Sequence, residues 1–185
     1  MELASFVADP VAAGTIVGAL ALVLLAAAWH KFSEPEVFEG SLSAYELLPQ
    51  WLVVPVARLL PWVEAGLAIG VLVPVTRPAA LGAVIALLLV YAAAIGANLL
   101  RGRRDIDCGC GGATQPLSWG LVARNLILCA AALVATRPTV ERSMDWTDAL
   151  TLVLGVLAFY ALYLMADELL RQASRLAQPG RPQQG

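Results

Sequence analysis

The stretch Val11–Trp29, VAAGTIVGALALVLLAAAW, decides the fold class of this chain. It contains no charged residue, and a helix of about 20 mostly apolar residues is long enough to cross a bilayer. His30 and Lys31 follow Trp29, a combination of aromatic and cationic side chains that is typical of a membrane–water interface. A cleaved signal peptide is the alternative, but the chain begins MEL without basic residues, and the apolar run is too long. We therefore expect a transmembrane helix over residues 11–31.

The composition of the whole chain agrees with a membrane protein. Of 185 residues, 59% are hydrophobic and 14% are charged, and the mean hydropathy is +0.75. An average soluble domain has roughly 25% charged residues, so an ordinary soluble globule and a disordered chain are both excluded. A net charge of −2 gives no basic field for nucleic acid. Three cysteines are too few for a disulfide scaffold.

Further apolar stretches predict spans at about residues 54–73, 79–100, 119–135 and 149–165. Residues 32–50 instead mix glutamates with apolar side chains at helical spacing, which indicates a short amphipathic helix at the interface that Pro49 ends. The predicted class is all-α, a polytopic transmembrane four-helix bundle plus an additional helix, about five spans in total. Residues 1–177 are predicted to form a single integral membrane domain, and residues 178–185 a disordered tail.

The basic residues other than Arg124 are distributed unevenly between the two predicted sides of the membrane. One side holds Lys31, Arg58, Arg101, Arg103, Arg104, Arg171, Arg175 and Arg181. The other side holds only Arg77, Arg137 and Arg142. Because cytoplasmic loops carry an excess of lysine and arginine, the richer side is predicted to be cytoplasmic, together with the 101–117 loop.

That loop, RGRRDIDCGCGGATQPL, contains the residues with the most distinctive chemistry. Cys108 and Cys110 are one residue apart among glycines, which allow unusual backbone angles and close approach by another chain. A disulfide between them would close a small ring, which suits an exchangeable pair better than a structural staple. The neighbouring arginines and the start of the next helix, near Ser118, favour the thiolate, whereas Asp105 and Asp107 oppose it. Redox chemistry is the favoured interpretation of this pair. The alternative is that both are incidental surface cysteines without a chemical role.

A metal site is a weaker alternative for the same loop. Cys108 and Cys110 could be joined by Asp107 or Asp105 and by His30, and thiolates favour zinc or cuprous copper. A closed zinc site needs four ligands, however, and the sequence supplies only two strong ones, so no metal is expected. Cys129 lies about 15 Å along the fourth span at 1.5 Å per residue, too far from the pair, and is predicted to be a packing residue.

Glu64 and Arg124 are charged residues inside predicted spans. A lone charge in the bilayer is costly, so each needs a partner. Both lie in the halves of their spans that face the cysteine loop, and we therefore expect them to form an ion pair, with Asn125 and Asn98 as additional partners. Such a pair could either fix helix packing or belong to a functional site.

Four segments together resemble one known family. They are HKFSEPEVFEGSLSAYELLP at 30–49, LPWVEAGLAIGVLV at 60–73, DCGCGG at 107–112 and PLSWGLVARNLIL at 116–128. This pattern, which covers most of residues 29–129, resembles the MauE family of methylamine-utilisation membrane proteins, which is related to DoxX-like membrane proteins. The Asp-Cys-Gly-Cys-Gly box followed by Arg-Asn is its most specific part. An aromatic residue often stands in the family where this chain has Gly111.

The resemblance implies a role in maturing the disulfide-rich small subunit of methylamine dehydrogenase, beside a thioredoxin-like partner. It implies that Cys108 and Cys110 are the redox residues and that Glu64, Arg124 and Asn125 form a supporting polar core. The bundle is also similar to that of vitamin K epoxide reductase-type enzymes, whose cysteines face the oxidising side. That implication conflicts with the orientation predicted from the arginines.

The sequence therefore predicts a multi-pass inner-membrane protein that exchanges thiols and disulfides with a partner in protein maturation. Three alternatives stay open: a non-enzymatic scaffold for a thioredoxin-like partner, a Cys-x-Cys metal-handling protein, and a small transporter that uses Glu64 and Arg124. Its partners are the lipid bilayer, a thioredoxin-like protein and a client protein, with no role for nucleic acid. No cofactor is evident; a quinone stays open as an alternative, although no fingerprint in the sequence supports it.

Overall fold

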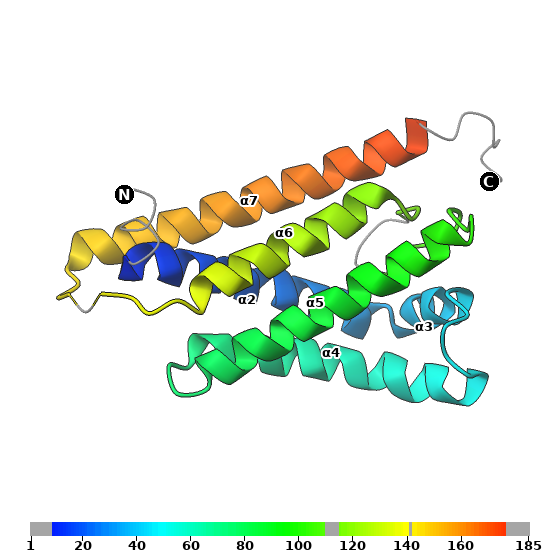
Figure 1. The fold of residues 1–185 in the computed structure, drawn as a ribbon, viewed down its shortest axis with the longest axis horizontal. Coiled ribbons are helices and arrows are strands. Elements are labelled where there is room, and N and C mark those ends of the chain that lie inside the picture. Colours follow the sequence, from blue (N-terminus) through cyan, green and yellow to red (C-terminus); the bar gives the residue numbers. More distant parts are fainter. Residues whose placement is uncertain (1–8, 110–114, 141, 177–185) are drawn as a thin grey trace.

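A computed structural model of the chain describes residues 9–109, 115–140 and 142–176. Its helices are α2 (Pro10–Ser33), α3 (Pro35–Ala44), α4 (Gln50–Leu72), α5 (Arg77–Leu100), α6 (Trp119–Ala135) and α7 (Trp146–Leu176). Figure 1 shows the long helices running roughly alongside one another, with α3 at one end of the bundle. Within the described ranges there is no strand beyond one isolated bridge between Asp107 and Pro116. The predicted all-α class is confirmed.

The membrane-spanning character of the chain is also confirmed. Four helices, α2, α4, α5 and α7, are long and apolar enough to cross a membrane, and α6 is a shorter apolar helix. At the start of α2, the Asp9 side chain accepts a hydrogen bond from the Val11 backbone N–H, and Pro10 occupies the first turn, where its missing N–H costs nothing.

α2 is the central helix, because it packs against α3, α4, α6 and α7, while α5 packs against α4 and α6. The main apolar core is formed where α2, α4, α5 and α6 meet, and includes Leu20, Val71, Val84 and Ala132. α7 packs directly on α2 at glycines: a Cβ on Gly18 would lie 2.6 Å from the Val156 side chain. Such close contact between small and large residues is how membrane helices associate.

Two helices differ in length from the predicted segments. α7 continues past the predicted span end near residue 165 to Leu176, and within this extension Asp167 pairs with Arg124 and Arg171 pairs with Glu168. The interfacial helix, α3, is shorter than predicted and ends at Ala44 rather than at Pro49. Glu46 follows it with φ of 49°, a left-handed conformation that ends a helix. The predicted tail at 178–185 lies outside the described residues.

Several chain segments meet at one end of the bundle. The C-terminal turns of α2, the helix α3, the loop between α5 and α6, and the last turns of α7 all lie there (Figure 1). Ser118 has the extended backbone of the predicted N-cap of α6, but its side chain makes no capping hydrogen bond.

Candidate functional site

The loop before α6 is pinned by backbone hydrogen bonds. The Cys108 N–H donates to the Gln115 carbonyl over 2.9 Å, and the Leu117 N–H donates to the carbonyls of Arg104 and Ile106. Cys108 is disulfide-bonded and only 7% exposed. Cys110, the other cysteine of the predicted pair, lies outside the described residues. The loop thus holds Cys108 in a fixed and nearly buried position.

α3 covers Cys108. The Tyr45 hydroxyl, just after α3, donates a 3.2 Å hydrogen bond to the Cys108 carbonyl. Burial raises the pKa of Tyr45 above its ordinary value, with the nearby Asp107 charge acting in the same direction, so this hydroxyl stays a donor. Gly109 has φ of +66°, and a Cβ there would lie 3.2 Å from Phe38 and 3.3 Å from Ser41. The glycine therefore allows the loop to lie directly against α3.

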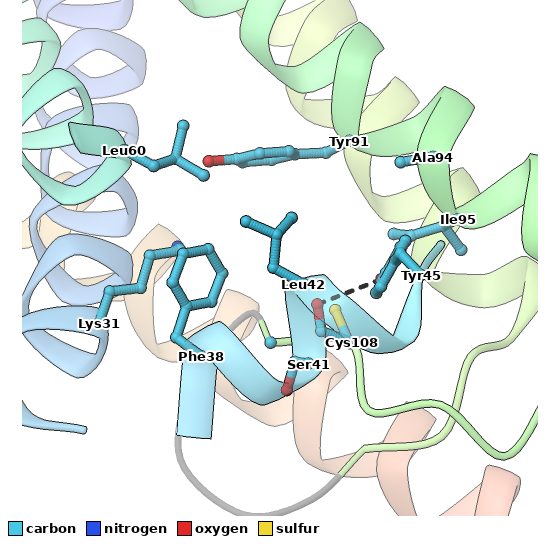
Figure 2. A pocket seen from close by; sticks show the side chains of 11 residues that line it. Lys31, Phe38, Ser41, Leu42, Tyr45, Leu60, Tyr91, Ala94, Ile95 and Cys108 are labelled. Atoms are coloured by element: carbon cyan, nitrogen blue, oxygen red, sulfur yellow. Dashed lines mark hydrogen bonds between the residues drawn. The ribbon is translucent and has the colours of Figure 1, made fainter. Parts of the chain in front are cut away.

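A small cavity of about 60 Å³ is lined by Cys108 together with residues of the long helices α2, α4 and α5. Figure 2 shows Leu60 and Tyr91 on one side of this cavity, and Cys108 on the other, beneath Leu42. Lys31 also lines it, beside the ring of Phe38. Residues from α2, α3, α4, α5 and the cysteine loop thus line one cavity.

A buried ionic network adjoins the cavity. The Lys31 ammonium lies 2.8 and 2.9 Å from the two carboxylate oxygens of Glu64, and these side chains are only 4% and 1% exposed. The Tyr91 hydroxyl donates a 2.6 Å hydrogen bond to Glu64. The Lys31 ammonium also lies 5.1 Å from the centroid of the Phe38 ring, within the range of cation–π attraction. The network thus gives the buried Glu64 carboxyl group two polar partners, Lys31 and Tyr91, inside the bundle.

The predicted ion pair between Glu64 and Arg124 is therefore wrong. Glu64 pairs with Lys31, and Arg124 pairs with Asp167 of α7. The prediction placed Lys31 at the interface as an anchor, but α2 continues through Ser33 and turns the Lys31 side chain into the bundle. It also ended the last span before Asp167 and so left Arg124 without this acid.

The two asparagines do not bridge the ionic groups as predicted. The Asn125 amide donates to the Leu121 carbonyl, and the Asn98 amide donates to the Ala94 carbonyl, each within its own helix. Both side chains are nearly fully buried. Asn125 therefore lies in the bundle interior, as expected of a polar core residue, but through a local hydrogen bond.

The other candidate residues occupy separate places. His30 is exposed and lines a shallow cavity with Asp107 and Gly109. Within the described part of the chain, no three His, Cys, Asp or Glu side chains are grouped as metal ligands. Cys129 is a free, buried thiol in the main core cluster, whereas Cys108 belongs to a different cluster with Tyr45, Ile95 and Leu121. The packing role predicted for Cys129 is confirmed.

Sequence reasoning missed Lys31, Tyr91, Tyr45 and Asp167 as members of the polar region. A signal for Lys31 was present, because an acid within one span calls for a base at the same depth in another. Tyr91 had a weaker signal, since a tyrosine hydroxyl in the middle of an apolar helix needs a partner. Nothing in the sequence distinguished Tyr45 from an ordinary interfacial aromatic residue.

Comparison with known proteins shows clear relatives. The model of the family described as "Methylamine utilisation protein MauE" matches residues 9–137. The chain is 42% identical to the "Methylamine utilization protein MauE" of Paracoccus denitrificans, over 89% of this chain and 90% of the relative. It is 42% identical to the protein of that name from Methylorubrum extorquens, over 69% and 70%, and 38% identical to that from Methylophilus methylotrophus, over 88% of each. No solved structure matches the chain.

Proposed function

Because the chain belongs to the MauE family of methylamine utilisation proteins, we propose that it is a membrane thiol–disulfide redox protein that assists the maturation of a partner protein. The redox residues are Cys108 and Cys110. The exchange partner is a thioredoxin-like protein, and the final client is a disulfide-rich subunit such as the small subunit of methylamine dehydrogenase. Glu64, Arg124 and Asn125 support the fold around the pair and take no part in the exchange.

The observation that carries this proposal is the disulfide-bonded state of the nearly buried Cys108 in a glycine-rich loop. A partner thiolate attacks one sulfur of the pair, the S–S bond breaks, and the other sulfur leaves as a thiolate. A second thiolate of the partner then attacks the partner's own sulfur in this mixed disulfide, and the remaining cysteine of this chain leaves as a thiolate. The partner leaves with a new disulfide, and the two cysteines retain its two electrons and two protons as thiols.

A structural staple is the second candidate function for the cysteines. It is favoured by one observation: Cys108 is 7% exposed and covered by α3. In that case the protein acts as a scaffold that holds the thioredoxin-like partner at the membrane, and its disulfide only fixes the loop against α3.

Growth on methylamine separates the two functions. A strain that lacks this gene is complemented with the native chain, with C108S/C110S, or with the control variant C129S. We expect the native chain and C129S to restore growth, and C108S/C110S to fail although it accumulates in the membrane to a comparable level. Full growth with C108S/C110S would reject the redox function and leave the scaffold.

A further inference from the structure

A second, larger hollow lies between α2, α6 and α7. It is a groove of about 730 Å³ with a floor from α2, including Ile16 and Val23, and walls from α6 and α7. This size falls within the range of about 300–1,000 Å³ that is usual for small-molecule sites. Among the residues that line it in the described structure, only Arg124 is charged and only Tyr163 carries a hydroxyl. The groove is thus apolar except at Arg124 and Tyr163.

Arg124 provides a donor without an acceptor. Its side chain is only 9% exposed, and its terminal nitrogen Nη1 pairs with Asp167. No described group accepts a hydrogen bond from its buried Nε. The Arg124 guanidinium lies 5.6 Å from the centroid of the Tyr163 ring. A buried N–H without a partner is costly, so a ligand that brings an oxygen acceptor to this point would be stabilised.

The charge balance selects the kind of acceptor. Asp167 already offsets the positive charge of Arg124, so the site has no surplus charge to compensate a phosphate. A neutral carbonyl oxygen meets the same N–H without adding charge to the bilayer interior. The flat surface of Tyr163 next to it suits a planar head group.

The shape of the groove indicates what kind of apolar group fits into it. At Gly120 the walls touch, because a Cβ there would overlap the Leu170 side chain. A helix about 10 Å wide cannot pass between α6 and α7 at that level, whereas a single flexible apolar chain can lie along the wider part. The alanines Ala123, Ala131 and Ala166 give this part its width.

We propose that the groove between α2, α6 and α7 binds an isoprenoid quinone, with one ring carbonyl accepting from Arg124 Nε and the tail lying along α6 and α7. The site goes beyond the proposed thiol exchange, because its contacts do not include a cysteine. One end of the groove reaches the end of the bundle that holds the disulfide: Leu121 packs in the Cys108 cluster, while its neighbour Gly120 lines the groove.

Photolabelling tests this site. The purified full chain, in lipid nanodiscs, is labelled with an azido-benzoquinone that carries a decyl tail, in competition with unlabelled decyl-benzoquinone. We compare A131F, which fills the groove, with A130F, its exposed neighbour on α6 that does not line it. We expect A131F to weaken labelling about tenfold and A130F less than about twofold. R124K keeps a cation for Asp167 but lacks Nε, and should weaken labelling at least about threefold.

The outcomes that would overturn the proposal are distinct. They are the absence of saturable labelling, equal labelling of A131F and A130F, unchanged labelling of R124K, or competition by phosphatidylcholine as strong as by unlabelled quinone. The last result would assign the groove to a lipid chain. C108S should be labelled to the same extent as the native chain. The proposal of quinone binding is therefore tested separately from the proposal of thiol exchange.

Discussion

At the scale of single residues, the pairing of charges inside the bundle decides which helices are tied together. Lys31 of α2 is bound to Glu64 of α4, and Arg124 of α6 is bound to Asp167 of α7. Each pair thus joins two helices near the end of the bundle that holds the cysteine loop. Tyr91 adds α5 to the first pair through its hydrogen bond to Glu64. These contacts tie α2, α4 and α5 into one group and α6 and α7 into another, and the two groups are held together by apolar packing.

A double-mutant cycle tests the Lys31–Glu64 pair. K31M or E64Q alone leaves one buried group without its partner, and we expect each to destabilise the protein by about 3–5 kcal/mol. The double variant K31M/E64Q should recover much of that loss. The measurement is the free energy of unfolding in detergent micelles.

The matched control for this cycle is E64Q combined with R124Q. Since Arg124 pairs with Asp167, the losses of these two variants should add within about 0.5 kcal/mol. A stronger coupling between Glu64 and Arg124 than between Glu64 and Lys31 would contradict the pairing.

The sequence identified some of these residues but not their partners. The charges of Glu64 and Arg124 were recognisable because they interrupt apolar runs. Their partners stand where helix ends were expected, and lysine at a helix end is ordinarily an interface anchor. Whether its amine points to water or turns inward depends on packing against α4 and α5, which hydropathy does not encode.

At the scale of elements, the contact between α3 and the cysteine loop shapes the candidate site. Gly109 and Gly102 both have positive φ, but only Gly109 has side chains of α3 next to the position of its missing Cβ. The two glycines therefore make a matched pair for substitution. A side chain at either position strains the backbone, but only a side chain at position 109 also meets α3.

We expect G109A to loosen the loop more than G102A. An alanine in the left-handed region costs roughly 1–2 kcal/mol at either position, but at Gly109 it must also displace Phe38 or Ser41. The readout is the rate at which dithiothreitol reduces the disulfide of Cys108, followed by gel shift with a maleimide-conjugated polymer in a C129S background. Reduction should be faster in G109A than in G102A. Equal rates would show that α3 does not protect the disulfide.

Most elements could be predicted from the sequence because apolar runs of the right length have few alternatives in a bilayer. The prediction for 119–135 agrees with α6, and that for 79–100 differs from α5 by only two residues at its start. The end of α7 and the length of α3 could not be predicted. They depend on the ion pair of Asp167 and on the left-handed turn at Glu46, which are tertiary and local backbone features without a hydropathy signal.

At the scale of the whole molecule, the two ends of the bundle differ in charge, and this difference predicts an orientation in the membrane. Arg58, Arg101, Arg103 and Arg104 are at the end with the cysteine loop, whereas Lys31 is buried against Glu64 and offers no free charge there. The positive-inside rule still predicts that this end is cytoplasmic.

A reporter fused after Gln178 tests the orientation. Because α7 ends at the same end as the cysteine loop, a cytoplasmic fluorescent reporter there should be bright, and an alkaline phosphatase fusion should be inactive (Figure 1). Active phosphatase without fluorescence would reverse the assignment. It would place the cysteines on the oxidising side of the membrane.

The central claim is that Cys108 and Cys110 exchange a disulfide with a partner protein, and trapping of the mixed disulfide tests it most directly. In a C129S background, C108S and C110S are each expressed in cells that grow on methylamine, and thiols are blocked with acid before electrophoresis without reductant. We predict that at least one single variant forms a larger, dithiothreitol-sensitive band that contains a thioredoxin-like protein, and that C108S/C110S forms none. No such band from either variant, with growth unimpaired in both, would contradict the account.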